Sequence, residues 1–183
     1  QNAPLNLYNG GFLTWSGDGY SVRSPIVIRP VALAAPTEIN AAIEGTAYPV
    51  TFGFNGSFGA TARGLVPAIT YDGNVAQDPD QTFSPNDPAG TILLRVAVPA
   101  GTSYARFALF NSDVVPGSDI DIFVYRPNGS FVGQSANGGS DEQVNDVSPV
   151  AGDYLVFIHG WGLPTGNTDF KLYSWVIGST ALG

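Results

Sequence analysis

Short runs of β-branched and aromatic residues, separated by glycine and proline, constrain the fold of this sequence more than any other feature. The 23 glycines and 14 prolines in 183 residues leave few stretches in which a long helix could form. Strand-like runs recur at residues 50–54, 92–98, 105–110, 120–125, 154–159 and 170–177. Six or more short strands with turn-rich connections predict an all-β fold, an antiparallel β-sandwich or jelly roll.

The first 30 residues predict a separate N-terminal β-hairpin. Residues 12–15 read as one strand, residues 16–19 as the turn and residues 20–23 as the returning strand. Pro25 is expected to interrupt the returning strand and suits an edge strand or a bulge, because proline has no N–H to donate to a ladder.

The rest of the chain predicts a linker followed by the main domain. Residues 31–47 are rich in alanine and proline and read as the linker, and residues 48–183 as the β-sandwich. Within the sandwich, residues 72–89 contain several prolines and predict an ordered surface loop. We expect Trp15 and Trp175 to lie in the core.

The charge of the chain bounds its partners. Fifteen acidic and seven basic residues give a formal net charge of −8. A field of this sign repels nucleic acid and anionic membrane surfaces, so we expect neither as a partner and favour cations, including Ca²⁺, or basic proteins. The sequence has no cysteine, which excludes disulfides and thiolate chemistry, and no apolar run of membrane-spanning length. It also has no methionine, and a chain that opens at Gln1 is expected to have been cut from a longer precursor.

Two carboxylates suggest a calcium site. Asp119 and Asp121 flank Ile120, so they share one face of a strand if the side-chain period is two. Other carboxylates are predicted on flanking loops that fold back toward them, namely Asp113, Asp146 and the pair at 141–142. Oxygen-rich loops of this kind bind Ca²⁺, and the alternative is a solvated acidic face without an ion.

A serine and a histidine raise the alternative of a small serine hydrolase. Residues 101–105 resemble the motif around the nucleophilic serine of subtilisin-like proteases. The flanking residues alternate as a strand does, however, so we interpret Ser103 as a turn residue. His159 is the only histidine in the chain and ends an apolar strand, where a hydrogen-bonded packing role is the simpler interpretation.

Trp161 is a candidate binding residue. It lies between Gly160 and Gly162 at a predicted strand end, where an exposed indole could stack on a sugar or contact a protein chain. The alternative is a loop residue folded over the sandwich.

Two segments resemble known families. Residues 11–16 and 22–28 resemble the closing strands of the fibronectin-type domain that follows the catalytic domain in many subtilases. Residues 98–107 and 118–130, with the later segment 150–160, resemble the bacterial prepeptidase C-terminal domain, a jelly-roll-like module of secreted proteases.

The order of these two resemblances implies the C-terminal region of a secreted subtilisin-like serine protease. The region would be noncatalytic and would support the stability, maturation or substrate positioning of the parent enzyme, whose catalytic domain would be its partner. Calcium binding and contact with a protein or polysaccharide substrate are further implications of the resemblance. An independent protein- or carbohydrate-binding module remains the alternative.

Overall fold

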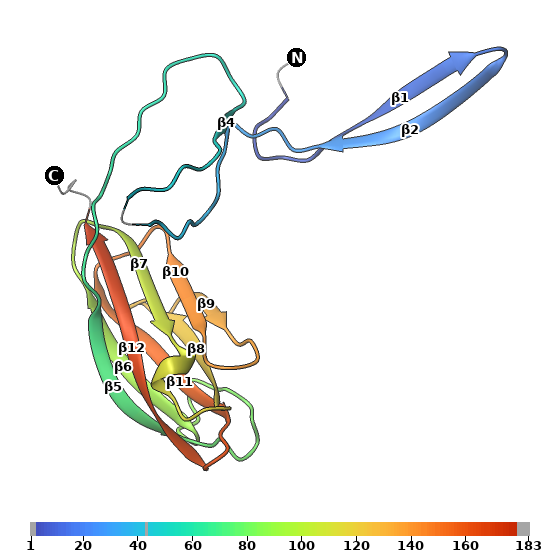
Figure 1. Cartoon of the computed structure of the whole chain (residues 1–183). Helices are drawn as coiled ribbons and strands as arrows, with labels where there is room; N and C mark the ends of the chain where they lie inside the picture. The colour runs from blue at the N-terminus through green and yellow to red at the C-terminus, as the bar shows by residue number, and fades with distance from the viewer. Residues whose placement is uncertain (1–2, 43, 179–183) are drawn as a thin grey trace. The chain divides into compact units, whose positions relative to one another are not determined.

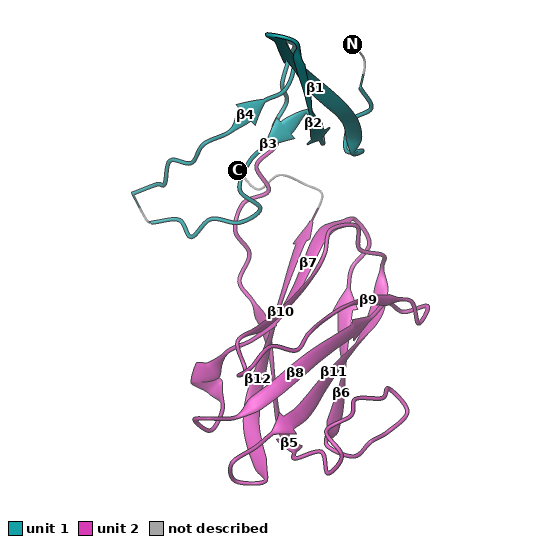
Figure 2. Cartoon of the chain, turned by 90° about the vertical axis from the view of Figure 1, so that its right-hand side faces the viewer, with its two compact units in different colours: residues 1–60 teal, residues 61–183 magenta. Residues whose placement is uncertain are grey.

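The computed structural model describes residues 3–42 and 44–178 and divides into two compact units, residues 1–60 and 61–183 (Figure 2). Nearly all of its regular structure is β-strand. Within the described ranges the one helical element is a 3₁₀ turn, η1 (Asn111–Asp113), and no helix there is long and apolar enough to cross a membrane. The predicted all-β class is confirmed.

The first unit contains the predicted hairpin, with longer strands than expected. Strands β1 (Asn9–Gly17) and β2 (Tyr20–Ile28) pair antiparallel along their whole length. Asp18 and Gly19 connect them with positive φ angles of 47° and 82°, as a two-residue type I′ turn requires. Pro25 lies within β2 and does not interrupt it, because both strands of a two-stranded ladder are edge strands, one of the two settings expected for this proline.

Trp15 lies on an exposed face of this hairpin, with 62% of its surface accessible, so its predicted place in a core is wrong. It pairs with Val22 and shares its face with Leu13, which are exposed as well. Two strands provide no second layer to cover such a face. The unit also contains a short ladder between β3 (Leu33–Ala34) and β4 (Thr51–Phe52).

The second unit is an antiparallel β-sandwich of two four-stranded sheets (Figure 1), which confirms the predicted architecture. The first sheet has the strand order β10-β7-β12-β5 and the second the order β6-β11-β8-β9. The eight strands are β5 (Ile69–Ala76), β6 (Thr91–Val98), β7 (Thr102–Leu109), β8 (Asp119–Tyr125), β9 (Phe131–Ser135), β10 (Glu142–Asp146), β11 (Gly152–Gly162) and β12 (Asn167–Gly178). The chain changes sheet at every connection except the one from β8 to β9.

Alternating side chains of both sheets fill the core between them. On β11, Tyr154, Val156 and Ile158 are fully buried. The Tyr154 ring stacks on Phe107 of the opposite sheet with 5.6 Å between ring centroids, and its hydroxyl donates to Asp146 Oδ2 at 2.9 Å. The buried hydroxyl therefore has an acceptor, as a polar group in an apolar core needs.

Two details of the sandwich correct the sequence analysis. Strand β5 extends to Ala76, so the first part of the segment 72–89 is an edge strand of the first sheet rather than a loop. Trp175 lies half-buried on the outer face of the same sheet, because its neighbours Ser174 and Val176 are the residues of β12 that face inward.

Candidate functional site

His159 lies between two carboxylates in the interior of the second unit. It is 1% exposed and pairs with Asp121 in the β11–β8 ladder. Its Nε2 lies 2.8 Å from Asp78 Oδ2 and its Nδ1 lies 3.4 Å from Asp121 Oδ2. The rings of Phe83 and Phe123 contact the imidazole edge-on, at 5.9 and 6.2 Å between centroids. One ring therefore connects β11, β8 and the loop that follows β5.

The two carboxylates determine the protonation of this ring. Burial alone would lower the pKa of His159, but the hydrogen bonds and negative charges of Asp121 and Asp78 outweigh burial, and the pKa is raised. The hydrogen bond from His159 in turn lowers the pKa of Asp78 in spite of its burial. Both ring nitrogens lie against carboxylate oxygens, so these contacts favour the protonated ring, which donates an N–H group from each nitrogen.

Loop 77–90 is fastened to the end of β11 by further hydrogen bonds. Gln77 donates from Nε2 to the Trp161 carbonyl at 2.7 Å and accepts from the Leu163 N–H at 2.6 Å. The backbone N–H of Asp78 donates to the carbonyl of Gly160 at 2.8 Å. A β-carbon at Gly160 would overlap the carbonyl oxygen of Ala76, so only glycine permits this approach of the two chains.

A cavity of about 350 Å³ lies beside this cluster, lined by Asp119, Asp121, Ala136, Asn137, Gly138 and Trp161. Asp119 and Asp121 lie on the same face of β8 while Ile120 between them is buried in the core, as the strand period predicts. Trp161 is the extra residue of a β-bulge, since Gly160 pairs with Ile120 and Gly162 pairs with Asp119. The bulge directs the indole to the cavity, where it is 44% exposed.

The polar atoms of this cavity are mainly acceptors. Asp119 Oδ1 is buried and has no hydrogen-bond partner among the described residues. Burial raises the pKa of Asp119, a hydrogen bond from the Gly139 backbone lowers it, and the charge of Asp121 raises it further. Asn137 donates its side-chain NH₂ to Glu142 and to Ser135, each at 3.1 Å, which leaves its Oδ1 as an acceptor. This set of oxygens suits a hard cation or a hydroxyl-rich ligand.

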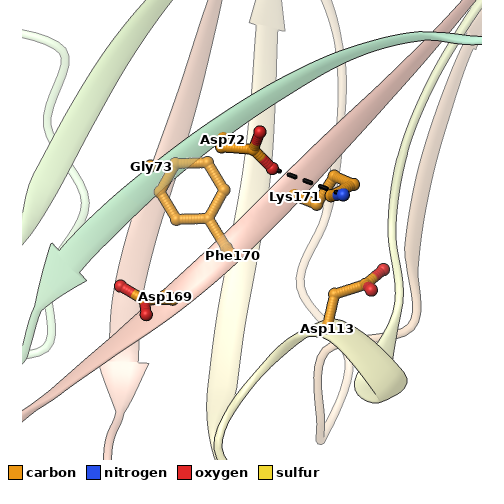
Figure 3. A pocket seen from close by; sticks show the side chains of 6 residues that line it. All are labelled: Asp72, Gly73, Asp113, Asp169, Phe170 and Lys171. Atoms are coloured by element: carbon orange, nitrogen blue, oxygen red, sulfur yellow. Dashed lines mark ion pairs between the residues drawn. The ribbon is translucent and has the colours of Figure 1, made fainter.

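Two of the other carboxylates predicted as calcium ligands, Asp146 and Asp113, lie elsewhere in the second unit. Asp146 accepts two hydrogen bonds from Arg126, each at 2.9 Å, and that hydrogen-bonded ion pair lowers the pKa of Asp146. Asp113 lines a separate cavity of about 550 Å³ (Figure 3), in which Asp72 forms an ion pair with Lys171 at 3.5 Å. No group of three or more acidic, histidine or cysteine residues within the described ranges is arranged to hold a metal ion.

The site contains residues that sequence reasoning missed. Asp78 lies in the segment 72–89, for which the sequence predicts a surface loop. Its side chain is nevertheless buried against His159, 81 positions further along the chain. Asn137 belongs to an Asn-Gly pair, which signals a turn and says nothing of a cavity. Neither residue carries a local signal for its role. Asp78 contacts His159, and Asn137 shares the cavity with Trp161, and both neighbours are distant in the sequence.

Ser103 and His159 do not form a nucleophile–base pair. Ser103 Oγ on β7 donates to the carbonyls of Ile177 and Gly178 at 3.1 and 3.0 Å. His159 is on β11 of the other sheet, with both nitrogens directed at carboxylates.

Comparison with known sequences finds a relative of this chain. The chain is 25% identical over 139 residues to pyrolysin of Pyrococcus furiosus, and the match covers 74% of this chain and 9% of the length of pyrolysin. The chain thus spans less than a tenth of the relative that it matches. No family model matches the sequence.

Among solved structures, the periplasmic g-type lysozyme inhibitor PliG of Aeromonas hydrophila is similar at a TM-score of 0.38 and 13% sequence identity. That alignment covers 60% of this chain and 86% of the inhibitor. A similarity of this degree carries no inference about function.

The buried charge cluster predicts how stability depends on pH. Because the pKa of His159 is raised above 6.5 in the native state, its contribution is fully present below pH 6.5 and is lost as the pH rises through the native-state pKa. Because the pKa of Asp78 is lowered from 3.8, its contribution is present above pH 3.8 and is lost as the pH falls through the native-state value. Chemical denaturation at several pH values should therefore show the free energy of unfolding decreasing as the pH rises above 6.5.

The chain has a single histidine, so one variant isolates this effect. His159→Gln keeps an amide donor but cannot titrate, and its free energy of unfolding should be lower and nearly constant over the same pH range. An equal decrease in the variant and the wild type would show that His159 is not the responsible group.

Proposed function

We propose that this chain is a noncatalytic accessory region of a secreted subtilisin-like serine protease, supporting the stability, maturation or substrate positioning of the enzyme. The observation that carries the proposal is the match to pyrolysin, a subtilisin-like protease, over 74% of this chain but 9% of pyrolysin. A match confined to so small a share of a protease is what an accessory region would give. The partner is then the catalytic domain of the parent protein, in the extracellular space.

The geometry of the second unit supports a noncatalytic role. Nucleophilic catalysis by serine needs a base within hydrogen-bond reach of the hydroxyl. Ser103 and His159 lie on different sheets, and each is engaged by other partners. The antiparallel sandwich also agrees with the resemblance of residues 98–160 to the prepeptidase C-terminal domain.

This proposal predicts that the purified chain has no serine-hydrolase activity. A fluorophosphonate probe should leave Ser103 unlabelled, because its hydroxyl proton is held by two carbonyls and no base is near. The variants Ser103→Ala and His159→Gln should differ from the wild type in stability alone. Stoichiometric labelling of Ser103 that is lost in His159→Gln would contradict the proposal and favour the hydrolase alternative.

The accessory role is tested in the complete protease. Deletion of the residues corresponding to 61–178 should leave the probe reaction of its catalytic serine intact while shortening the half-life of activity at high temperature or lowering turnover of large protein substrates. A truncated enzyme equal to the full-length enzyme in maturation, heat inactivation and proteolysis would contradict an accessory role.

Calcium is part of the proposal as a stabilising ion at the cavity beside Trp161. The carboxylates of Asp119 and Asp121 and the Oδ1 of Asn137 are the oxygens that would hold it, with water completing a shell of six to eight ligands. The fit is supported by the buried Asp119 oxygen that lacks a partner and by the like charge of Asp121 beside it. Asp113 and Asp146 would take no part.

Calcium should therefore raise the melting temperature. A ligand that binds the native state alone stabilises it by mass action, so excess chelator should lower the melting temperature relative to millimolar Ca²⁺, with the far-ultraviolet spectrum still that of a β-protein. Asp119→Asn should remove the difference, whereas Asp153→Asn, at an exposed position of β11, should keep it. Identical melting curves of the wild type with Ca²⁺ and with chelator would exclude the ion.

A further inference from the structure

We propose that the cavity beside Trp161 is a binding site for a neutral saccharide, whose apolar ring face lies on the indole and whose hydroxyls donate to Asp119, Asp121 and Asn137. The inference rests on the geometry of this cavity and is independent of the proposed accessory role. The sequence suggests Trp161 and the two carboxylates as separate candidates, and the fold places all three on one cavity.

The backbone of Trp161 is held at the cavity by two hydrogen bonds. The carbonyl of Trp161 accepts hydrogen bonds from the side chains of Gln77 at 2.7 Å and Gln81 at 2.8 Å, both from loop 77–90. The bulge between Gly160 and Gly162 directs the side chain out of the β11–β8 ladder. A large aromatic ring that is 44% exposed at the wall of a cavity offers the flat apolar surface on which the C–H groups of a sugar ring pack.

The polar side of the cavity selects a ligand that donates hydrogen bonds. Asp119 Oδ1 has no partner within the described part of the chain, and the side chain of Asp121 is 8% exposed with its Oδ2 held by His159. Asn137 has committed its NH₂ group to Glu142 and Ser135. A ligand without donors would leave the Asp119 oxygen unsatisfied after desolvation, which is costly, whereas sugar hydroxyls supply several donors at once.

Charge narrows the ligand class further. Two carboxylates on one cavity repel acidic sugars and phosphate esters, so a neutral saccharide fits better than an anionic one. The acceptors are also pre-positioned, since Asp121 is oriented by its contact with His159 and Asn137 by its hydrogen bond to Glu142. Pre-positioned groups lose little entropy on binding, which favours affinity.

The test is a titration of the isotope-labelled chain with soluble neutral hexasaccharides, namely cellohexaose, maltohexaose, xylohexaose and chitohexaose, in the presence of a chelator. At least one of them should shift the indole N–H resonance of Trp161 and the amide resonances of Asn137 and Gly138 in a saturable manner. Trp161→Ala should weaken that binding about tenfold or more, the loss of one aromatic stacking contact. Asp119→Asn should weaken it by several-fold.

The matched control is Trp15→Ala, which removes an exposed indole from the hairpin and should leave the affinity unchanged. Oligogalacturonate should not bind. Added Ca²⁺ should weaken saccharide binding, because the ion and the hydroxyls compete for the same oxygens.

Three results would overturn the proposal. One is the absence of a saturable shift with every hexasaccharide. Another is equal affinity of Trp161→Ala and the wild type, in a variant whose spectrum keeps the dispersion of a folded chain. The third is binding that requires added Ca²⁺, since the carboxylates would then not contact the sugar directly.

Discussion

The contact of His159 with the carboxylates of Asp78 and Asp121 is the interaction on which the arrangement of the second unit depends. It joins strand β11, strand β8 and loop 77–90, and all three side chains are buried. Buried charges are costly unless each has a partner, and removing one partner leaves the others uncompensated. The cluster is therefore better understood as a device that specifies one position of the loop than as a large net source of stability. Through that loop, Gln77 and Gln81 fix the backbone of Trp161.

A second charged cluster at the other end of β8 serves the core. Arg126, which follows the strand directly, binds Asp146 in a bidentate manner, and the same carboxylate accepts the hydroxyl of the buried Tyr154. Its charges and donors are matched within the cluster. The Asp119–Asp121 end of the strand differs, because a buried carboxylate oxygen there has no donor among the described residues and an indole stands half-exposed beside it. This imbalance is why the two ligands that we propose, a calcium ion and a neutral saccharide, draw on the same few oxygens.

Local patterns were sufficient to predict the fold class but not the site. Short runs of β-branched and aromatic residues, separated by glycine and proline, predicted the antiparallel sandwich. The strand period placed Asp119 and Asp121 on one face. The pairing of Asp78 with His159 could not be predicted, because proline suggested a surface loop and no sequence signal joins residues 81 positions apart. Trp161 was found as a candidate, yet its proximity to the carboxylates follows from a bulge whose register no single sequence reveals. The prediction that Trp15 lies in a core is wrong, because it assumed that a second layer covers every hydrophobic residue of a strand.

The protonation of His159 is the most direct test of this account, and nitrogen NMR of the single histidine measures it. In ¹⁵N-labelled protein, long-range ¹H–¹⁵N correlation spectra over a pH series should show the ring titrating above pH 6.5, with both ring nitrogens protonated below that titration and both N–H protons protected from exchange. A neutral ring with one unprotonated nitrogen at pH 7, titrating at or below pH 6.5, would contradict it. The loop and the cavity would then have to be held by some other interaction.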